Sequence, residues 1–331
     1  MFVLIDKMID KVVLNVDIST PYKDLADRLE ELAERNKLQR CSEGKTVYYK
    51  STPEAKLTGL YLQTKGDKLQ IKCSLHKQFY YRLFGSLDNS GEFTMYNAKW
   101  IINTLFEEIG IDPKSGFVTH YEIGLNIHTD RAPLEYISII KMISGKEFLI
   151  DPNFKRNRQK ITDKSRTIRK VFKVYDKGFE MSDRKRQPHD NDPNILRIET
   201  VFRREKIKVT EFFSKKHLNK IATQFIKDWR TIEFQREIKG TKGTHKSQRE
   251  RALLIFELGL EGYKNHISRQ FERGETTQKE YRTAREFARD WDKIKGGFLL
   301  IHSELEKEYR EKLESTFRKM NDADIGINRQ N

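Results

Sequence analysis

The sequence predicts an α+β protein: a mainly antiparallel central sheet with packed helices, followed by a helical C-terminal region. Two observations predict this class. Before about residue 210, segments with the two-residue period of strands alternate with a few helical patterns, and hairpin signals are mixed with crossover signals. After that point, long charged segments with the period of an α-helix dominate.

The first predicted elements are a strand and a helix. Met8 to Ile18 is rich in apolar residues, as expected for a strand. Ser19-Thr20-Pro21 then supplies a cap and a first-turn proline for a helix. Leu25, Leu29 and Leu32 follow at spacings of four and three, so they form the apolar stripe of that helix.

A hairpin and several further elements follow. Lys56 to Gln63 and Lys68 to Leu75 alternate polar and apolar residues around Lys65-Gly66-Asp67, which is a turn signal. The remaining elements of this block are predicted as a helix over Thr94 to Ile109, a strand over Phe117 to His128, a helix over Pro133 to Ile143, and strands over Arg166 to Asp176 and Asn194 to Lys206.

Glycine-containing segments interrupt the later helical region at residues 240–244 and 296–297. We place a domain boundary near residue 240, which gives a first domain of residues 1–240 and a helical region of residues 241–331. In that region Ser247 is predicted to cap one helix and Thr276 or Thr277 a second.

Charge indicates the class of partner. The 331 residues include 64 Lys and Arg against 49 Asp and Glu, a net charge of +15. A surplus of this size favours a polyanion, because binding releases condensed counterions. Nucleic acid is therefore the expected partner, and the alternative is a basic soluble protein without one. The two short helices after residue 240 would then either read DNA or give structural support.

Membrane insertion and secretion are not expected. No apolar run approaches the length of a spanning helix, and Met1 to Asp17 contains charges that a secretory signal lacks. Cys41 and Cys73 have no metal-site spacing and fit a reducing cytoplasm.

Two predicted strands carry carboxylates on a polar face. Glu122 shares a face with Asn126 and His128, and Glu199 projects from the same side as Arg197. If both strands lie in one sheet, Glu122 and Glu199 could hold Mg²⁺ or Mn²⁺, which prefer carboxylate oxygens. The alternatives are a solvated face for Glu122 and structural ion pairs for Arg197 and Glu199.

A third strand carries a tyrosine among cations. Arg169, Lys173 and Tyr175 share one side, and Lys177 joins them if the strand continues. A Tyr hydroxyl beside a cation and a carboxylate-held metal can attack a DNA phosphodiester and keep the broken end bound. Nearby cations would favour the phenolate, and Lys177 is the candidate for that role. The alternative is an ordinary strand that ends at Asp-Lys-Gly.

Basic segments flank this strand. Nine Lys or Arg residues lie between Lys155 and Lys173 with one acidic residue, Asp163, and Arg184-Lys185-Arg186 follows. Such loops could cradle a DNA backbone. Nearby aromatics at Tyr80, Tyr81 and Phe84 could stack on unpaired bases or pack in a helix core. The residues predicted to bind DNA are Arg166, Arg169, Lys170, Lys173, Arg197 and Arg203.

Five segments in this order resemble the gene II family of filamentous-phage replication initiators, which are rolling-circle nickases. They span roughly residues 8 to 208. The segments are Met8-Ile9-Asp10, Leu69 to Lys72 with Phe84-Gly85, the Glu122 strand, the Tyr-x-Lys-x-x-Glu strand that starts at Tyr175, and Arg197-x-Glu199. Three features depart from the family pattern: Glu122 stands where Asp is common, Gln70 stands where a carboxylate could lie, and no His-x-His pair is present.

The resemblance implies that Tyr175 is the nucleophile, that Lys177 is the lysine of the motif, and that Glu122 and Glu199 are the family's acidic positions. It implies a metal-dependent nickase that cuts one strand at an origin, forms a 5′-phosphotyrosine link and later rejoins the strand. Expected partners are origin DNA and the host helicase and polymerase, in the cytoplasm of a bacterial host. The alternatives are a non-enzymatic, sequence-specific DNA-binding protein and a metal-dependent nuclease with a water nucleophile.

Overall fold

The structure is a computed structural model, and it describes residues 9–19, 24–52, 58–85, 93–151, 158–165, 167–183, 194–301 and 303–327. The chain forms two units. The first unit comprises Met1–Glu233 and Tyr309–Asn331, and the second unit comprises Phe234–Glu308. The sequence pattern predicts one boundary near residue 240, whereas in the structure the chain leaves the first unit after residue 233 and returns to it at residue 309.

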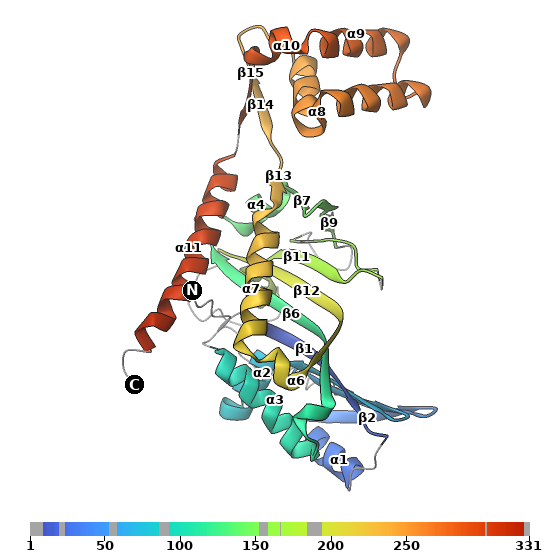
Figure 1. The fold of residues 1–331 in the computed structure, drawn as a ribbon, viewed down its shortest axis with the longest axis vertical. Coiled ribbons are helices and arrows are strands. Elements are labelled where there is room, and N and C mark those ends of the chain that lie inside the picture. Colours follow the sequence, from blue (N-terminus) through green and yellow to red (C-terminus); the bar gives the residue numbers. More distant parts are fainter. Residues whose placement is uncertain are drawn as a thin grey trace. The chain divides into compact units, whose positions relative to one another are not determined.

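The first unit is built on a ten-stranded sheet (Figure 1). In spatial order its strands are β2 (Leu38–Glu43), β3 (Thr46–Ser51), β4 (Leu60–Lys65), β5 (Lys68–Ser74), β1 (Ile9–Asp17), β6 (Gly116–His128), β12 (Ile195–Lys208), β11 (Lys170–Asp176), β10 (Gln159–Ile161) and β9 (Leu149–Ile150). All nine neighbouring pairs are antiparallel. The predicted α+β class with a mainly antiparallel sheet is therefore confirmed.

One face of this sheet is apolar and covered by helices. Strand alternation places Val12, Leu14 and Val16 of β1 on this face, and all three are at most 1% exposed. The covering helices are α1 (Leu25–Arg35), α3 (Met95–Ile109) and α7 (Lys215–Arg230) (Figure 1). The opposite face, called here the open face, carries the polar side chains of the same strands.

Specific contacts fix the helices on the covered face. The Tyr49 hydroxyl of β3 donates to Glu30 of α1 at 3.0 Å. The Trp229 indole of α7 donates to the Thr200 hydroxyl of β12 at 3.0 Å, and both residues are fully buried. Gly116 of β6 lies so close to the Phe106 ring of α3 that a Cβ there would be 2.5 Å from it. Each of the three helices is thus tied to a strand by at least one close contact.

Several predicted elements are confirmed. The hairpin around Gly66 is β4 and β5, and the strands over residues 117–128 and 194–206 are β6 and β12. The helix after Thr94 is α3, where the Thr94 side chain accepts from the Asn97 N–H. The apolar stripe of α1 includes buried Leu29 and Leu32, while Thr20 and Pro21 of its predicted start lie outside the described residues.

Other elements differ from the prediction. The helix predicted over Pro133 to Ile143 ends at Ile139 (α4, Pro133–Ile139), and Ile140–Ile143 form strand β7, because β-branched residues favour a strand there. Strand β11 begins at Lys170 instead of Arg166. The β2–β3 hairpin was not predicted; its turn contains Gly44 at φ 56°. The chain also turns into α5 (Lys177–Asp183) directly after β11.

The second unit consists of helices and a two-stranded sheet. Its elements are β14 (Glu237–Gly240), α8 (Lys246–Glu272), α9 (Gln278–Arg289), α10 (Trp291–Ile294) and β15 (Phe298–Ile301). Thr277 caps α9 as predicted, but the cap of α8 is His245 and not Ser247. Phe287 and Trp291 belong to the core of this unit.

The remaining elements are short except for the last helix. They are β8 (Lys146–Glu147), α2 (Leu75–Phe84), α6 (Val209–Phe212), β13 (Ile232–Phe234) and α11 (Glu304–Ile327). Within the first unit, Arg230 at the end of α7 forms a two-point ion pair with Glu314 of α11, with distances of 2.7 and 2.8 Å. In the part of the chain that the structure describes, no helix is both long and apolar enough to cross a membrane.

The contact between α7 and the sheet can be tested by removing one hydroxyl. Thr200→Val should lower the free energy of unfolding by about 1–3 kcal/mol, because valine keeps the shape but leaves the buried indole N–H of Trp229 without an acceptor. Urea unfolding followed by circular dichroism measures the change. The exposed Thr210→Val is the control and should stay within about 0.5 kcal/mol of the wild type. Equal effects of the two substitutions would contradict the assignment.

Candidate active site

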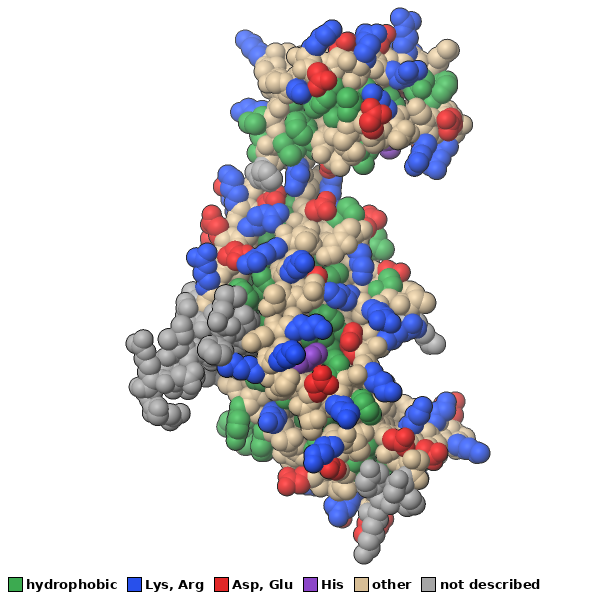
Figure 2. Space-filling model, in the orientation of Figure 1, with side chains coloured by type: hydrophobic (Ala, Val, Ile, Leu, Met, Phe, Trp, Pro, Cys, Tyr) green, Lys and Arg blue, Asp and Glu red, His purple; other side chains and the backbone are tan. Residues whose placement is uncertain are grey.

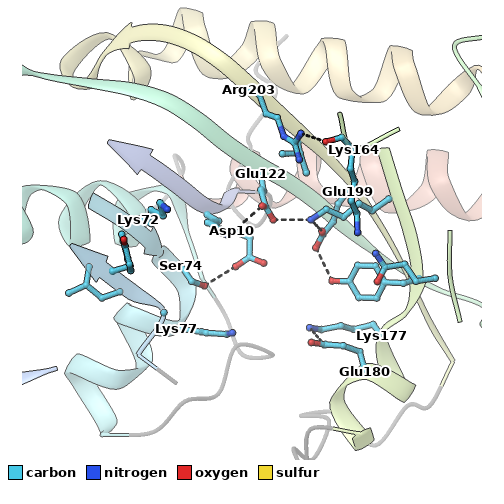
Figure 3. Close-up of a pocket in the computed structure, with 18 residues that line it drawn as sticks. Asp10, Lys72, Ser74, Lys77, Glu122, Lys164, Lys177, Glu180, Glu199 and Arg203 are labelled. Atoms are coloured by element: carbon cyan, nitrogen blue, oxygen red, sulfur yellow. Dashed lines mark hydrogen bonds and ion pairs between the residues drawn. The ribbon is translucent and has the colours of Figure 1, made fainter. Parts of the chain in front are cut away.

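A cavity of about 660 Å³ lies on the open face of the sheet (Figure 3). Its walls come from strands that are far apart in the sequence, including β1, β5, β6, β11 and β12. The cationic side chains that line it are Lys11, Lys72, Lys77, Lys164, Lys173, Lys177 and Arg203. The carboxylates are Asp10, Glu122, Glu180 and Glu199. With Tyr175 also in the wall, this pocket contains all four predicted catalytic and metal-binding residues.

The pairing register brings the predicted residues together. Lys173 of β11 lies opposite Glu199 of β12, and Glu199 lies opposite Gly124 of β6. Gly124 leaves room for the Arg197 guanidinium, since a Cβ at this position would be 2.4 Å from Arg197 Nη2. A glycine in the middle of β6 is therefore required by the close approach of this side chain.

Glu199 is the acceptor for three neighbours. The Tyr175 hydroxyl donates to its Oε1 at 2.8 Å, and Arg197 Nε donates to the same oxygen at 3.1 Å. The Lys173 ammonium donates to Oε2 at 3.2 Å. Burial opposes ionisation of Glu199, but the charges of Lys173 and Arg197 outweigh burial and lower its pKa. Glu199 is thus a buried carboxylate that stays ionised at neutral pH.

The electrostatic setting of Tyr175 differs from the prediction. Burial and the neighbouring Glu199 carboxylate raise the pKa of Tyr175 well above its ordinary value of 10. Lys177 begins α5 instead of extending the strand, and its ammonium pairs with Glu180 at 2.7 Å. In this structure the Lys177 ammonium is thus paired with a carboxylate, and its expected role beside a phenolate stays a prediction. The phenol is protonated, and its proton is directed at Glu199.

Lys173 links the two predicted metal ligands. Its ammonium lies 3.2 Å from Glu122 Oε2 and 3.2 Å from Glu199 Oε2. Burial would lower the pKa of Lys173, but the two carboxylates raise it. His120 and Lys11 lie on the other oxygen of Glu122, at 3.5 and 3.7 Å. Every cation in this cluster is matched by a carboxylate, which offsets the cost of burial.

The carboxylates of Glu122 and Glu199 suit a hard divalent cation, both as ligand types and in the way they point. Glu122 and Glu199 both point at one cation position, and carboxylate oxygens are suitable ligands for Mg²⁺ or Mn²⁺. That position is held by the Lys173 ammonium. No group of three or more His, Cys, Asp or Glu side chains arranged for a metal occurs among the described residues. A divalent ion at Glu122 and Glu199 would therefore compete with Lys173.

The residues predicted to bind DNA lie in different surroundings. Arg203 lines the pocket and donates to the Lys164 carbonyl at 3.1 Å. Lys173 and Arg197 are engaged in the ion pairs around Glu199. Lys170 lies on the covered face, where it pairs with Asp228 of α7 at 2.8 Å.

Other predicted contacts lie at the surface or outside the described residues. Arg169 is exposed next to β11, and Arg166 and residues 184–186 lie outside the described residues. Of the aromatics proposed to stack on bases, the Tyr81 hydroxyl donates to the Arg35 carbonyl. The Tyr80 ring lies 5.4 Å from the 65% exposed ring of Phe84.

Several pocket residues were not singled out from the sequence. Asp10 accepts a hydrogen bond from Ser74 at 3.2 Å and lies 3.8 Å from Arg197 Nη2. Asp10 and Glu180 both stand inside the segments that carry the family resemblance, so the resemblance could have identified them as site residues. Lys72 also stands in one of these segments, and Lys164 stands in the basic run from Lys155 to Lys173. Their place in the pocket, however, depends on which strands become neighbours.

The net charge alone does not locate this site. In Figure 2, Lys and Arg side chains are spread over the visible surface, and Asp and Glu side chains are interspersed among them. The pocket is distinguished instead by its buried, matched charges around Tyr175. Comparisons with known proteins found no protein-family model that matches this chain and no curated protein that matches it.

The protonation state of Tyr175 can be measured directly. In a titration of tyrosinate absorbance, the wild type and Tyr175→Phe should give superimposable curves from neutral pH to pH 10, because the raised pKa keeps this phenol protonated over that range. The curves should separate only at higher pH. A wild-type curve that shows one additional tyrosine titrating below pH 10 would contradict the assigned environment.

Proposed function

We propose that the protein is a DNA nickase that uses Tyr175 to cut one strand and to rejoin it. The observation that carries this proposal is the 2.8 Å hydrogen bond from the Tyr175 hydroxyl to the buried Glu199 carboxylate, in a pocket lined by six lysines and Arg203. A hydroxyl nucleophile paired with a proton acceptor, beside cations, is the arrangement that covalent attack on a phosphodiester needs.

In the proposed reaction, Glu199 is the group that accepts the proton of the Tyr175 nucleophile. The Tyr175 oxygen attacks the phosphorus while its proton passes to Glu199. The bond from phosphorus to the 3′ oxygen breaks, and that oxygen takes a proton from solvent. The products are a 5′-phosphotyrosine link and a free 3′ hydroxyl. Rejoining is the reverse attack by a 3′ hydroxyl, and because the phosphodiester energy is kept in the link, it requires no ATP.

The lysines have a separate part in this scheme. Attack adds negative charge to the phosphoryl oxygens, and ammonium groups already fixed in the wall stabilise that charge without reorganisation. Lys177 is 7% exposed and held by Glu180, so its position is set before DNA binds. Lys173 and Arg197 keep Glu199 ionised, and the 2.8 Å hydrogen bond directs the Tyr175 proton at it.

The wider function is a rolling-circle replication initiator, with origin DNA and the host helicase and polymerase as partners in a bacterial cytoplasm. This part rests on the five segments that resemble the gene II family, and residues from these segments line one continuous pocket. Mg²⁺ or Mn²⁺ would be held by Glu122 and Glu199 and would supply further positive charge at the phosphate.

Replacement of the nucleophile tests the proposal. Tyr175→Phe should abolish nicking of supercoiled DNA that carries the flanking sequence of the protein's own gene, and no protease-sensitive protein–DNA adduct should form. DNA affinity should stay nearly unchanged, since only one hydroxyl is lost. Tyr61→Phe is the matched control: it removes a hydroxyl from the same pocket and should leave nicking intact. Adduct formation by Tyr175→Phe would exclude this residue as the nucleophile.

The competition between Lys173 and a metal gives a second test, with stability as the readout. Lys173→Met should lower the free energy of unfolding by about 3–5 kcal/mol, because the buried Glu199 and the partly buried Glu122 lose their shared cation. Added Mn²⁺ should then raise the melting temperature of Lys173→Met more than that of the wild type. The double variant Lys173→Met with Glu122→Gln should lose this response. If Mn²⁺ raised the melting temperature of Lys173→Met no more than that of the wild type, Glu122 and Glu199 would not be metal ligands.

A further inference from the structure

Next to the pocket, the open face of the sheet carries two tyrosines and two lysines from β3, β4 and β5. We call the set Tyr48, Lys50, Tyr61 and Lys72 the tyrosine ladder. Strand alternation turns these side chains away from the helices, and their neighbour Tyr49 is buried on the covered face at 3% exposure. The ladder side chains are exposed or half-buried.

The ladder has a defined geometry. The rings of Tyr48 and Tyr61 are stacked, with centroids 6.3 Å apart and planes inclined by 23°. The Lys72 ammonium lies 4.4 Å from the centroid of the Tyr61 ring, and the Lys50 ammonium lies 5.9 Å from that of Tyr48. The Tyr61 hydroxyl also donates to Gln63 at 3.0 Å. The rings are thus held in place before any ligand binds.

The ladder is continuous with the candidate active site. Tyr61 and Lys72 line the same pocket as Tyr175, and Tyr48 extends the row by one strand. Among the described residues, neither Lys50 nor Lys72 forms an ion pair with a carboxylate. This differs from the pocket interior, where Lys173 and Lys177 are matched by Glu side chains.

Alternating aromatic rings and unmatched ammonium groups suit one kind of ligand. Unpaired bases stack on aromatic rings, and the phosphates between them are neutralised by lysines. A duplex keeps its base faces stacked inside, so it cannot use the rings. Resting on the proposed nicking function, we propose that the tyrosine ladder binds single-stranded DNA beside the cleavage pocket, with bases stacked along Tyr61 and Tyr48 and phosphates at Lys72 and Lys50.

The test measures binding separately from cleavage. Full-length protein with Tyr175→Phe, which removes the proposed nucleophile, is titrated with a fluorescent oligo-dT strand and with a matched duplex at one fixed salt concentration. Tyr48→Leu and Tyr61→Leu should each weaken oligo-dT binding by about five- to hundred-fold, the range expected for one lost stack. Duplex binding should change by less than about two-fold, since a duplex offers no base face to the rings.

Matched variants separate stacking from other effects. Tyr48→Phe and Tyr61→Phe keep the rings and should bind oligo-dT as the parent does. Tyr96→Leu removes a 78% exposed tyrosine from α3 and should have no effect. Lys50→Gln and Lys72→Gln should each lower the salt dependence of oligo-dT binding by about 0.7 in the log–log slope.

Crosslinking gives a readout that does not depend on the folding of a variant. An oligonucleotide with 5-iododeoxyuridine, irradiated on the parent protein, should attach to peptides that contain Tyr48 or Tyr61. Parent-like oligo-dT binding by both leucine variants, or crosslinks only elsewhere, would overturn the ladder. If protein that keeps Tyr175 still nicks DNA when it carries Tyr48→Leu or Tyr61→Leu, the proposed nicking function stands without the tyrosine ladder. Nicking by the Tyr175→Phe protein would contradict the proposed nucleophile, whereas its binding of oligo-dT tests the tyrosine ladder alone.

Discussion

The site depends on one partly buried ammonium. Lys173 Nζ lies 3.2 Å from carboxylate oxygens on two neighbouring strands, so a single cation from β11 joins Glu122 of β6 to Glu199 of β12. Without it, the partly buried Glu122 and the buried Glu199 would lie close together with reduced compensation, a costly arrangement away from bulk water. With it, Glu199 stays ionised and fixed, and the Tyr175 hydroxyl has a defined acceptor. The orientation of the proposed nucleophile therefore follows from a charge balance that is built into the sheet.

The sheet separates stability from chemistry by its two faces. Residues such as Val12, Leu14 and Thr200 pack against helices, while their strand neighbours carry the charges of the pocket. Each of these strands thus contributes residues to the apolar core and to the pocket. A one-residue slip in register would exchange the side chains of the two faces. The long antiparallel pairing of β6 with β12, which runs from Ile195 opposite His128 to Lys208 opposite Phe117, holds that register at the centre of the site.

Local periodicity was enough to predict which residues share a strand face. It correctly placed Lys173 beside Tyr175, and Glu199 beside Arg197, on the face that forms the site. It could not show that β11, β12 and β6 are adjacent, because strand order is set by pairing between distant segments. It also failed for Lys177: a position two residues from Tyr175 predicts proximity along a strand, but the chain enters α5 there and Lys177 pairs with Glu180. Burial and the hydrogen-bonded Glu199 carboxylate raise the pKa of the phenol, which is opposite to the expected direction.

The second unit is an insertion, and its two junctions are adjacent in the first unit. Arg230, just before the exit of the chain, is bound through two contacts to Glu314, just after its return, and Arg310 donates to the carbonyls of Arg230 and Ile232. Truncation near residue 240 would therefore also remove the second segment of the first unit, Tyr309–Asn331. Excision of residues 234–308 with a short linker across the junction would leave those contacts in place. The architecture thus permits modular exchange of the insert without cutting the chain that forms the sheet.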